Sequence, residues 1–176
     1  MHKLDIALSD VDRGVYQQLE LRLAQHPSES LRHLVTRTLA YCLWWEEGIA
    51  FGKGISQAEE PAVWIHDLTG QLTAWIEVGT PAADRLHRAT KASPRVAIYT
   101  QHDPRLLVKE VGTRTIHRLD EVKAFAFDQA FLDGLGATLG RATAWSVTHS
   151  DGTLYVEAGG ASWSGVVTPV VLVAEA

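Results

Sequence analysis

The segment from residue 59 to residue 81 constrains the fold of this chain more than any other, because its apolar and polar residues alternate. Strict alternation is typical of a β-strand with one buried face. Residues 67–70 (DLTG) favour a turn between two such runs, and the Asp67 side chain is expected to bond back to the turn backbone. The segment therefore predicts a β-hairpin.

A turn centred on Leu68 and Thr69 fixes which side chains share a face of this hairpin. One face is then uniformly apolar and predicts part of the core: Val63, Ile65, Leu72, Ala74, Ile76 and Val78. The other face carries Glu60, Trp64, His66, Trp75 and Glu77. In this register Glu60 lies directly opposite Glu77, and two such carboxylates repel unless a cation, a proton or solvent separates them. This polar face is the first candidate for chemistry.

The segments around the hairpin predict a mixture of strands and helices. Strands are expected at 3–9, 15–24, 95–100, 122–127, 143–148, 153–158 and 166–173, with a strand or loop at 49–55. Helices are expected from the N-cap Ser28 to residue 47, and at 81–92, 103–110 and 129–139. Because a helix joins strand 71–78 to strand 95–100, the two strands should be parallel.

Composition limits the classes of function. The chain has 176 residues, of which 46% are hydrophobic and 21% charged, and this favours one domain with its own core. Its net charge of −5 means that a polyanion would need a local basic patch. The single cysteine, Cys42, excludes an internal disulfide and a cysteine-rich zinc site. No apolar run reaches the roughly 18 residues of a membrane helix, and no signal peptide is recognisable, so we expect a soluble, cytoplasmic protein without a membrane partner.

Several spaced motifs give the first 100 residues a specific resemblance. They are QHPSE at 25–29 before an aliphatic helix, FGKG at 51–54, EP at 60–61 before Trp64, and WIEVG at 75–79 followed by Pro81. Together they closely resemble the bacterial YaeQ family, which is regarded as a divergent branch of the PD-(D/E)XK nuclease superfamily. The resemblance implies an α/β (α+β) fold with a restriction-endonuclease-like core. That core is a mixed central β-sheet flanked by helices, with additional C-terminal strands, in one domain over residues 1–176.

The resemblance also implies a candidate metal site. In such nucleases, acidic residues on neighbouring strands share a divalent metal, and a nearby lysine positions the attacking water. Glu77 matches the second acidic position, and Glu29 lies where a helix carboxylate can complete the site. A Mg²⁺ or Mn²⁺ ion held by carboxylates would lower the pKa of a bound water and neutralise developing charge. An active enzyme of this type would be a metal-dependent nuclease that hydrolyses phosphodiester bonds.

This sequence departs from the family pattern at two positions of that site. Ala62 stands where the family has an acidic residue, and Gly79 stands where the superfamily has lysine. Glu60 is the replacement ligand to consider, which makes Glu77 and Glu60 the metal ligands and adds Glu29 as a third catalytic carboxylate. Arg85, Arg88 or Lys91 of the following helix could supply the basic group, and Arg88 is the catalytic candidate, although arginine does not deprotonate as lysine does.

Two readings without catalysis stay open. The chain either uses the scaffold to bind nucleic acid, through Arg32, Arg85, Arg88 and Lys91, or acts as a protein-interaction module through a strand edge or its C-terminal part. Structural roles explain the same residues, because helix arginines are commonly solvated and tryptophans commonly pack. For Glu77 the structural alternative is an ion pair with Arg32, Arg85 or Arg88.

Overall fold

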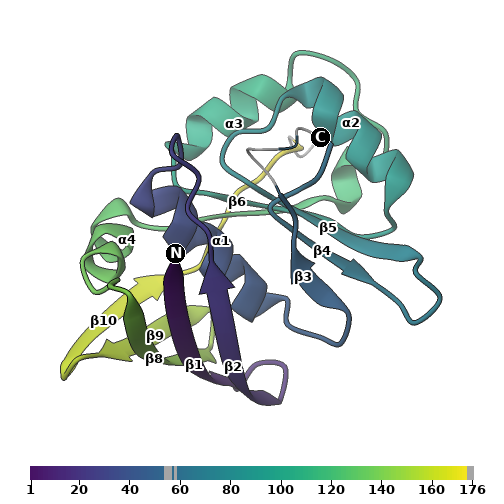
Figure 1. The fold of residues 1–176 in the computed structure, drawn as a ribbon. Helices are drawn as coiled ribbons and strands as arrows, with labels where there is room; N and C mark the ends of the chain where they lie inside the picture. Colours follow the sequence, from purple (N-terminus) through teal and green to yellow (C-terminus); the bar gives the residue numbers. More distant parts are fainter. Residues whose placement is uncertain (54–56, 58, 174–176) are drawn as a thin grey trace.

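Two mixed β-sheets and four α-helices form the frame of the computed structural model, which describes residues 1–53, 57 and 59–173 (Figure 1). The mixed α and β composition is confirmed. The expected mixed sheet flanked by helices is present, and the additional C-terminal strands form a second mixed sheet together with the N-terminal strands. No helix among the described residues is long and apolar enough to cross a membrane.

The first sheet joins the two ends of the chain. Its strands, in spatial order, are β10 (Ala161–Val166), β9 (Thr153–Ala158), β8 (Ala142–Ser150), β1 (His2–Asp10) and β2 (Val15–Leu23). The two predicted hairpins, β1–β2 and β8–β9, are confirmed as antiparallel pairs. Strand β1 also pairs with β8 in parallel. No local pattern indicates this pairing, because its partners come from opposite ends of the sequence.

The second sheet contains the central hairpin. Its strands, in spatial order, are β11 (Thr168–Pro169), β7 (Lys123–Ala126), β6 (Val96–Thr100), β5 (Leu72–Val78), β4 (Val63–His66) and β3 (Ile49–Phe51). Strands β5, β6 and β7 are parallel, as expected for the first two. The prediction of a C-terminal strand at 166–173 is wrong, since only residues 168–169 join this sheet. Of the segment 49–55, residues 54 and 55 lie outside the described part.

The register of the β4–β5 hairpin differs from the predicted one. Trp64 pairs with Trp75 and Ile65 with Ala74, and the register shifts at Ile65 and His66. The partners of Trp64 and Ile65 move by two residues, so these two side chains keep their predicted faces while their partners change. His66 pairs with Leu72, where the register shifts. The cause is the turn, in which the backbone N–H of Asp67 donates to the carbonyl of Gln71 at 2.9 Å and closes a longer loop than expected. Glu60 lies outside β4, and it is not the cross-strand partner of Glu77.

Helix α1 (Leu31–Leu43) packs between the two sheets. Nine of its thirteen residues are buried, including Arg37, so almost every side of the helix faces protein. It begins and ends inside the predicted bounds. Ser30 is the N-cap, because its side chain accepts a hydrogen bond from the backbone of His33, whereas the predicted cap Ser28 lies in the turn before the helix.

The other helices cover the outer surfaces. Helices α2 (Ala83–Ala92) and α3 (Pro104–Val111) lie on the face of the second sheet that points away from α1 (Figure 1). Leu86, Leu107 and Ile98 form the small core between them and the sheet. A 3₁₀ turn (Leu119–Glu121) leads into β7, and α4 (Gln129–Gly136) packs against α1 and β10. The second sheet therefore has one face toward α1 and one toward α2 and α3.

Candidate functional site

Glu77, the central residue of the predicted metal site, lies on the α2 face of the second sheet. Its Oε1 atom accepts hydrogen bonds from Trp75 Nε1 at 2.7 Å and from Arg85 Nε at 2.6 Å. The Glu77 side chain is only 7% exposed, so this carboxylate would be costly to bury without its cation. The pair with Arg85 is one of the structural alternatives that the sequence offered.

Glu29 lies in the turn before α1, on the opposite side of the sheet. Its carboxylate accepts from Arg37 Nε at 2.7 Å, from Arg37 Nη2 at 3.1 Å and from His33 Nδ1. Burial alone would raise the pKa of Glu29, but the hydrogen bonds and charges of His33 and Arg37 outweigh it and lower the pKa to about 2. Glu29 is therefore ionised and fully partnered.

The second sheet separates these two carboxylates. Along β5, Ala74 and Ile76 face the core around α1, whereas Trp75 and Glu77 face α2. The backbone carbonyl of Glu60 accepts from Arg85 Nη2 at 2.7 Å. In the part of the chain that the structure describes, no group of three His, Cys, Asp or Glu side chains is arranged to hold a metal ion. Glu29 is thus not brought together with Glu77, whereas Glu60 and Glu77 both contact Arg85.

The four predicted nucleic-acid contacts divide into two kinds. Arg32 forms a two-pronged ion pair with Asp133 of α4, with both N–O distances 2.7 Å. Arg85 is held by Glu77. Arg88 and Lys91, in contrast, are exposed on α2, and neither has a hydrogen-bonded ion-pair partner within the described ranges.

Two histidines and an ion-paired arginine lie around Arg88 and Lys91. His87 accepts a hydrogen bond from the backbone of His117 at 3.0 Å, and Arg114 pairs with Asp84 at 2.7 Å. Partial desolvation lowers the pKa of His87, and the charges of Arg114, Lys91 and His117 lower it further. We call this set the α2 basic surface: His87, Arg88, Lys91, Arg114 and His117. Sequence reasoning missed Arg114 and His117, because they follow α3 and approach α2 only in the folded chain.

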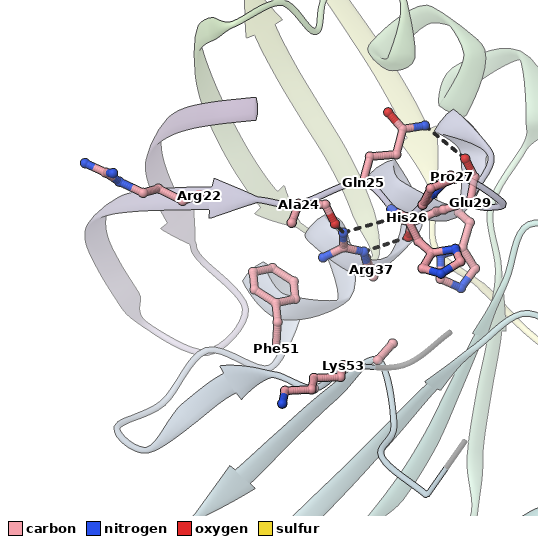
Figure 2. Close-up of a pocket in the computed structure, with 12 residues that line it drawn as sticks. Arg22, Ala24, Gln25, His26, Pro27, Glu29, Arg37, Phe51 and Lys53 are labelled. Carbon is pink, nitrogen blue, oxygen red and sulfur yellow. Dashed lines mark hydrogen bonds and ion pairs between the residues drawn. The ribbon is translucent and has the colours of Figure 1, made fainter. Parts of the chain in front are cut away.

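A cleft of about 450 Å³ opens beside Glu29, between the end of β2, the turn before α1 and the end of β3 (Figure 2). We call it the α1 cleft. Its lining residues are Arg22, Ala24, Gln25, His26, Pro27, Glu29, His33, Arg37, Phe51, Gly52, Lys53 and Ala62. Residues 25–29 and 51–53 are also motifs that carry the family resemblance, and Ala62 is the position where that pattern is acidic. Those motifs were the available signal for a shared site.

Comparison with known proteins agrees with these motifs. A family model described as YaeQ protein matches residues 1–166. Among curated proteins, the chain is 30% identical over 100 residues to "Uncharacterized protein YaeQ" of Escherichia coli strain K12, and 30% identical over 99 residues to the protein of that name from Salmonella typhi. The first alignment covers 57% of this chain and 55% of the relative, so it spans about half of the curated protein.

Solved structures match over nearly the whole chain. The crystal structure of YaeQ protein from Pseudomonas syringae superposes with a TM-score of 0.88 at 31% identity, covering 97% of this chain and 94% of that one. The structure of YaeQ protein from Xanthomonas axonopodis pv. citri gives 0.85 at 29% identity, with 96% of each chain covered. The two-sheet fold with α1 between the sheets is therefore shared with these proteins.

Proposed function

The chain belongs to the YaeQ family, and from that premise we propose that it binds nucleic acid through the α2 basic surface without cleaving it. The observation that carries the proposal is the exposure of Arg88 and Lys91, beside two histidines and the ion pair of Arg114 with Asp84, in a chain whose net charge is −5. Phosphate contacts from lysine and arginine supply most of the sequence-independent affinity for nucleic acids. A local cationic surface is the form that such a site takes on an acidic protein.

The state of the carboxylates supports binding rather than cleavage. A metal-dependent nuclease needs free carboxylate oxygens that converge on one ion. Here Oε1 of Glu77 accepts from Arg85 and Trp75, and the Glu29 carboxylate accepts from Arg37 and His33, on the opposite face of the sheet. Ala62 offers no ligand at the acidic position of the family pattern. The competing proposal is the metal-dependent phosphodiesterase activity that the superfamily leads us to expect. The experiments must therefore measure cleavage separately from binding.

A binding and cleavage assay with charge-reversal variants tests the proposal. Labelled single- and double-stranded DNA and RNA are titrated with the wild-type protein and with the double variant Arg88→Glu/Lys91→Glu. The matched control is Lys3→Glu/Lys123→Glu, which changes two exposed lysines and the net charge by the same amount. We expect the α2 variant to lose at least tenfold in affinity and the control to lose much less. Equal losses in both variants would contradict the proposal.

The same preparations are then incubated with the labelled strands in Mg²⁺ and in Mn²⁺, beside Glu77→Gln. We expect intact strands in every case. Metal-dependent cleavage that disappears in Glu77→Gln would contradict the non-catalytic proposal and support the nuclease.

A further inference from the structure

Strand β2 forms one edge of the first sheet, and no strand within the described residues pairs with its outer side. It is long for an edge strand, with nine residues against six in β10, three in β3 and two in β11. It contains no proline and no lysine, and its register with β1 runs without a shift over all nine residues. Proline, lysine and register shifts are devices that commonly block an edge, so β2 is open to pairing with a further strand.

The pairing of β1 shows which backbone groups of β2 point outward. The backbone N–H of Lys3 donates to the carbonyl of Arg141, on the β8 side of β1. Because the backbone groups of successive residues in a strand point to alternate sides, those of Leu4 point toward β2, where Leu4 faces Leu21. Leu21 therefore directs its N–H and C=O toward β1. The N–H and C=O groups of Glu20 and Arg22, one position on either side, point away from the sheet.

Glu20 and Arg22 also carry charges that the facing residues of β1 do not balance. On the exposed face of the sheet, Arg22 lies directly opposite Lys3, and Glu20 lies directly opposite Asp5. Like charges in directly opposite positions destabilise a strand pair. Neither Glu20 nor Arg22 forms an ion pair in the part of the chain that the structure describes. The edge therefore presents one acidic and one basic position, two residues apart, each beside a like charge.

We propose that a second copy of this chain pairs with β2 through its own β2, antiparallel and about a two-fold axis at Leu21. An antiparallel pair requires an outward-pointing residue of one copy to face an outward-pointing residue of the other. An axis at Glu20 would set two glutamates against each other, and an axis at Arg22 would do the same with two arginines. An axis at Leu21 instead places Glu20 of each copy opposite the partner's Arg22, so the symmetry forms this contact twice.

This arrangement satisfies the backbone and the charges of the edge together. Glu20 and the partner's Arg22 would exchange two backbone hydrogen bonds while their side chains lie next to each other. Across the interface, the acidic pair of Asp5 and Glu20 then meets the basic pair of Arg22 and Lys3. The two five-stranded sheets would become one continuous sheet. The proposal does not depend on nucleic-acid binding, because the α2 basic surface lies on the other sheet.

Analytical ultracentrifugation of charge-reversal variants tests the proposal. The wild type is sedimented from low micromolar to near-millimolar concentration, beside Glu20→Arg, Arg22→Glu and the double variant that carries both changes. The matched control is Glu157→Arg, which reverses an exposed glutamate on β9, inside the same sheet. We expect the wild type to dimerise, each single variant to weaken the dimer at least tenfold, and the double variant to restore it. The control should dimerise like the wild type.

Amide hydrogen exchange provides a second readout at the proposed contact. The backbone amides of Glu20 and Arg22 should exchange more slowly at concentrations where the wild type is a dimer, and rapidly in each single variant. Circular dichroism and thermal unfolding confirm that every variant is folded. A wild type that stays monomeric at every concentration would overturn the proposal. So would single variants that dimerise like Glu157→Arg, or a double variant that dimerises as weakly as the single ones.

Discussion

Glu29 and Arg37 form a two-pronged ion pair at the N-terminal end of α1, where the helix enters the space between the two sheets. Both side chains are nearly buried, and Arg37 also donates to the backbone carbonyl of Ala24 at 3.1 Å. The pair therefore ties the turn before α1 to the end of β2. The pair therefore has a structural role. The resemblance assigns the Glu29 carboxylate to catalysis, but in this structure the carboxylate is engaged in the ion pair.

The Glu29 pair predicts a specific dependence of stability on pH. Because folding lowers the pKa of Glu29 from 4.5 to about 2, the carboxylate stabilises the folded state fully above pH 4.5, and this contribution is lost as the pH falls toward 2. The shift corresponds to about 3 kcal/mol at neutral pH. We expect Glu29→Gln to lower the free energy of unfolding most above pH 5. The difference from the wild type should shrink steadily between pH 4.5 and pH 2, as measured by urea denaturation. A difference that is constant with pH would contradict this account.

The buried pair of Glu77 and Arg85 should show strong coupling in a double-mutant cycle. Removing one partner leaves the other charge unpaired in a nearly closed site, so Glu77→Gln and Arg85→Met should each cost about 3 kcal/mol of unfolding free energy. The double variant should cost clearly less than the two single costs together. The exposed pair of Arg105 and Asp103 is the control, and its coupling should be much weaker because solvent screens both charges. Additive costs at Glu77 and Arg85 would show that the two charges do not stabilise each other.

Two exposed glycines should respond very differently to the same substitution. Gly48 has φ +94°, and a Cβ added there would lie 2.0 Å from the carbonyl oxygen of His66. Gly14 has φ +68°, and its Cβ would meet nothing within 4 Å. We expect Gly14→Ala to cost about 1 kcal/mol and Gly48→Ala about 3 kcal/mol or more, because only the second adds a clash to the backbone strain. Chemical denaturation of the two variants measures the difference, and similar costs would be evidence against the contact between β3 and β4.

The thiol of Cys42 should be unreactive in the folded protein. It is fully buried in α1, and burial raises the pKa of its thiol to about 12. Because the thiolate is the reactive form, a disulfide reagent at pH 8 should modify it only as fast as the protein unfolds. The test compares the reaction rate in buffer with the rate in denaturing urea. Rapid modification of the native protein would mean that α1 is not enclosed by the two sheets.

Local patterns predicted much of the fold, because strand alternation and helix periodicity depend on neighbouring residues. The shared face of Trp64 and Trp75, the parallel arrangement of β5 and β6, and the two outer hairpins were all correct. The errors have two sources, one in distant segments and one in the detail of a turn. The pairing of β1 with β8 joins distant segments, and the exact hairpin register depends on hydrogen bonds within the turn that Asp67 makes.

For the candidate site too, the contacts between residues close in sequence were predicted and those that depend on the packing of α1 were not. The ion pair of Glu77 and Arg85 was among the structural alternatives, because both residues fall near each other across one β–α connection. The pairing of Glu29 with Arg37 was not, since it depends on α1 beginning after Ser30. Neither was the position of Glu29 and Glu77 on opposite faces of a sheet, because it depends on α1 lying between two sheets. The motifs at 25–29 and 51–53 indicated a common site without revealing that Arg37 pairs with Glu29 there.

The salt dependence of nucleic-acid binding tests the central claim most directly. Affinity for one double-stranded DNA is measured from low to moderate salt for the wild type, for Arg88→Glu/Lys91→Glu and for the control Lys3→Glu/Lys123→Glu. Each phosphate contact contributes a slope of about −0.9 to the plot of log affinity against log salt concentration. The account predicts a wild-type slope of about −2 to −4 that the α2 variant reduces by about 2 and the control leaves unchanged. A slope near zero in the wild type, or the same slope in all three proteins, would contradict it.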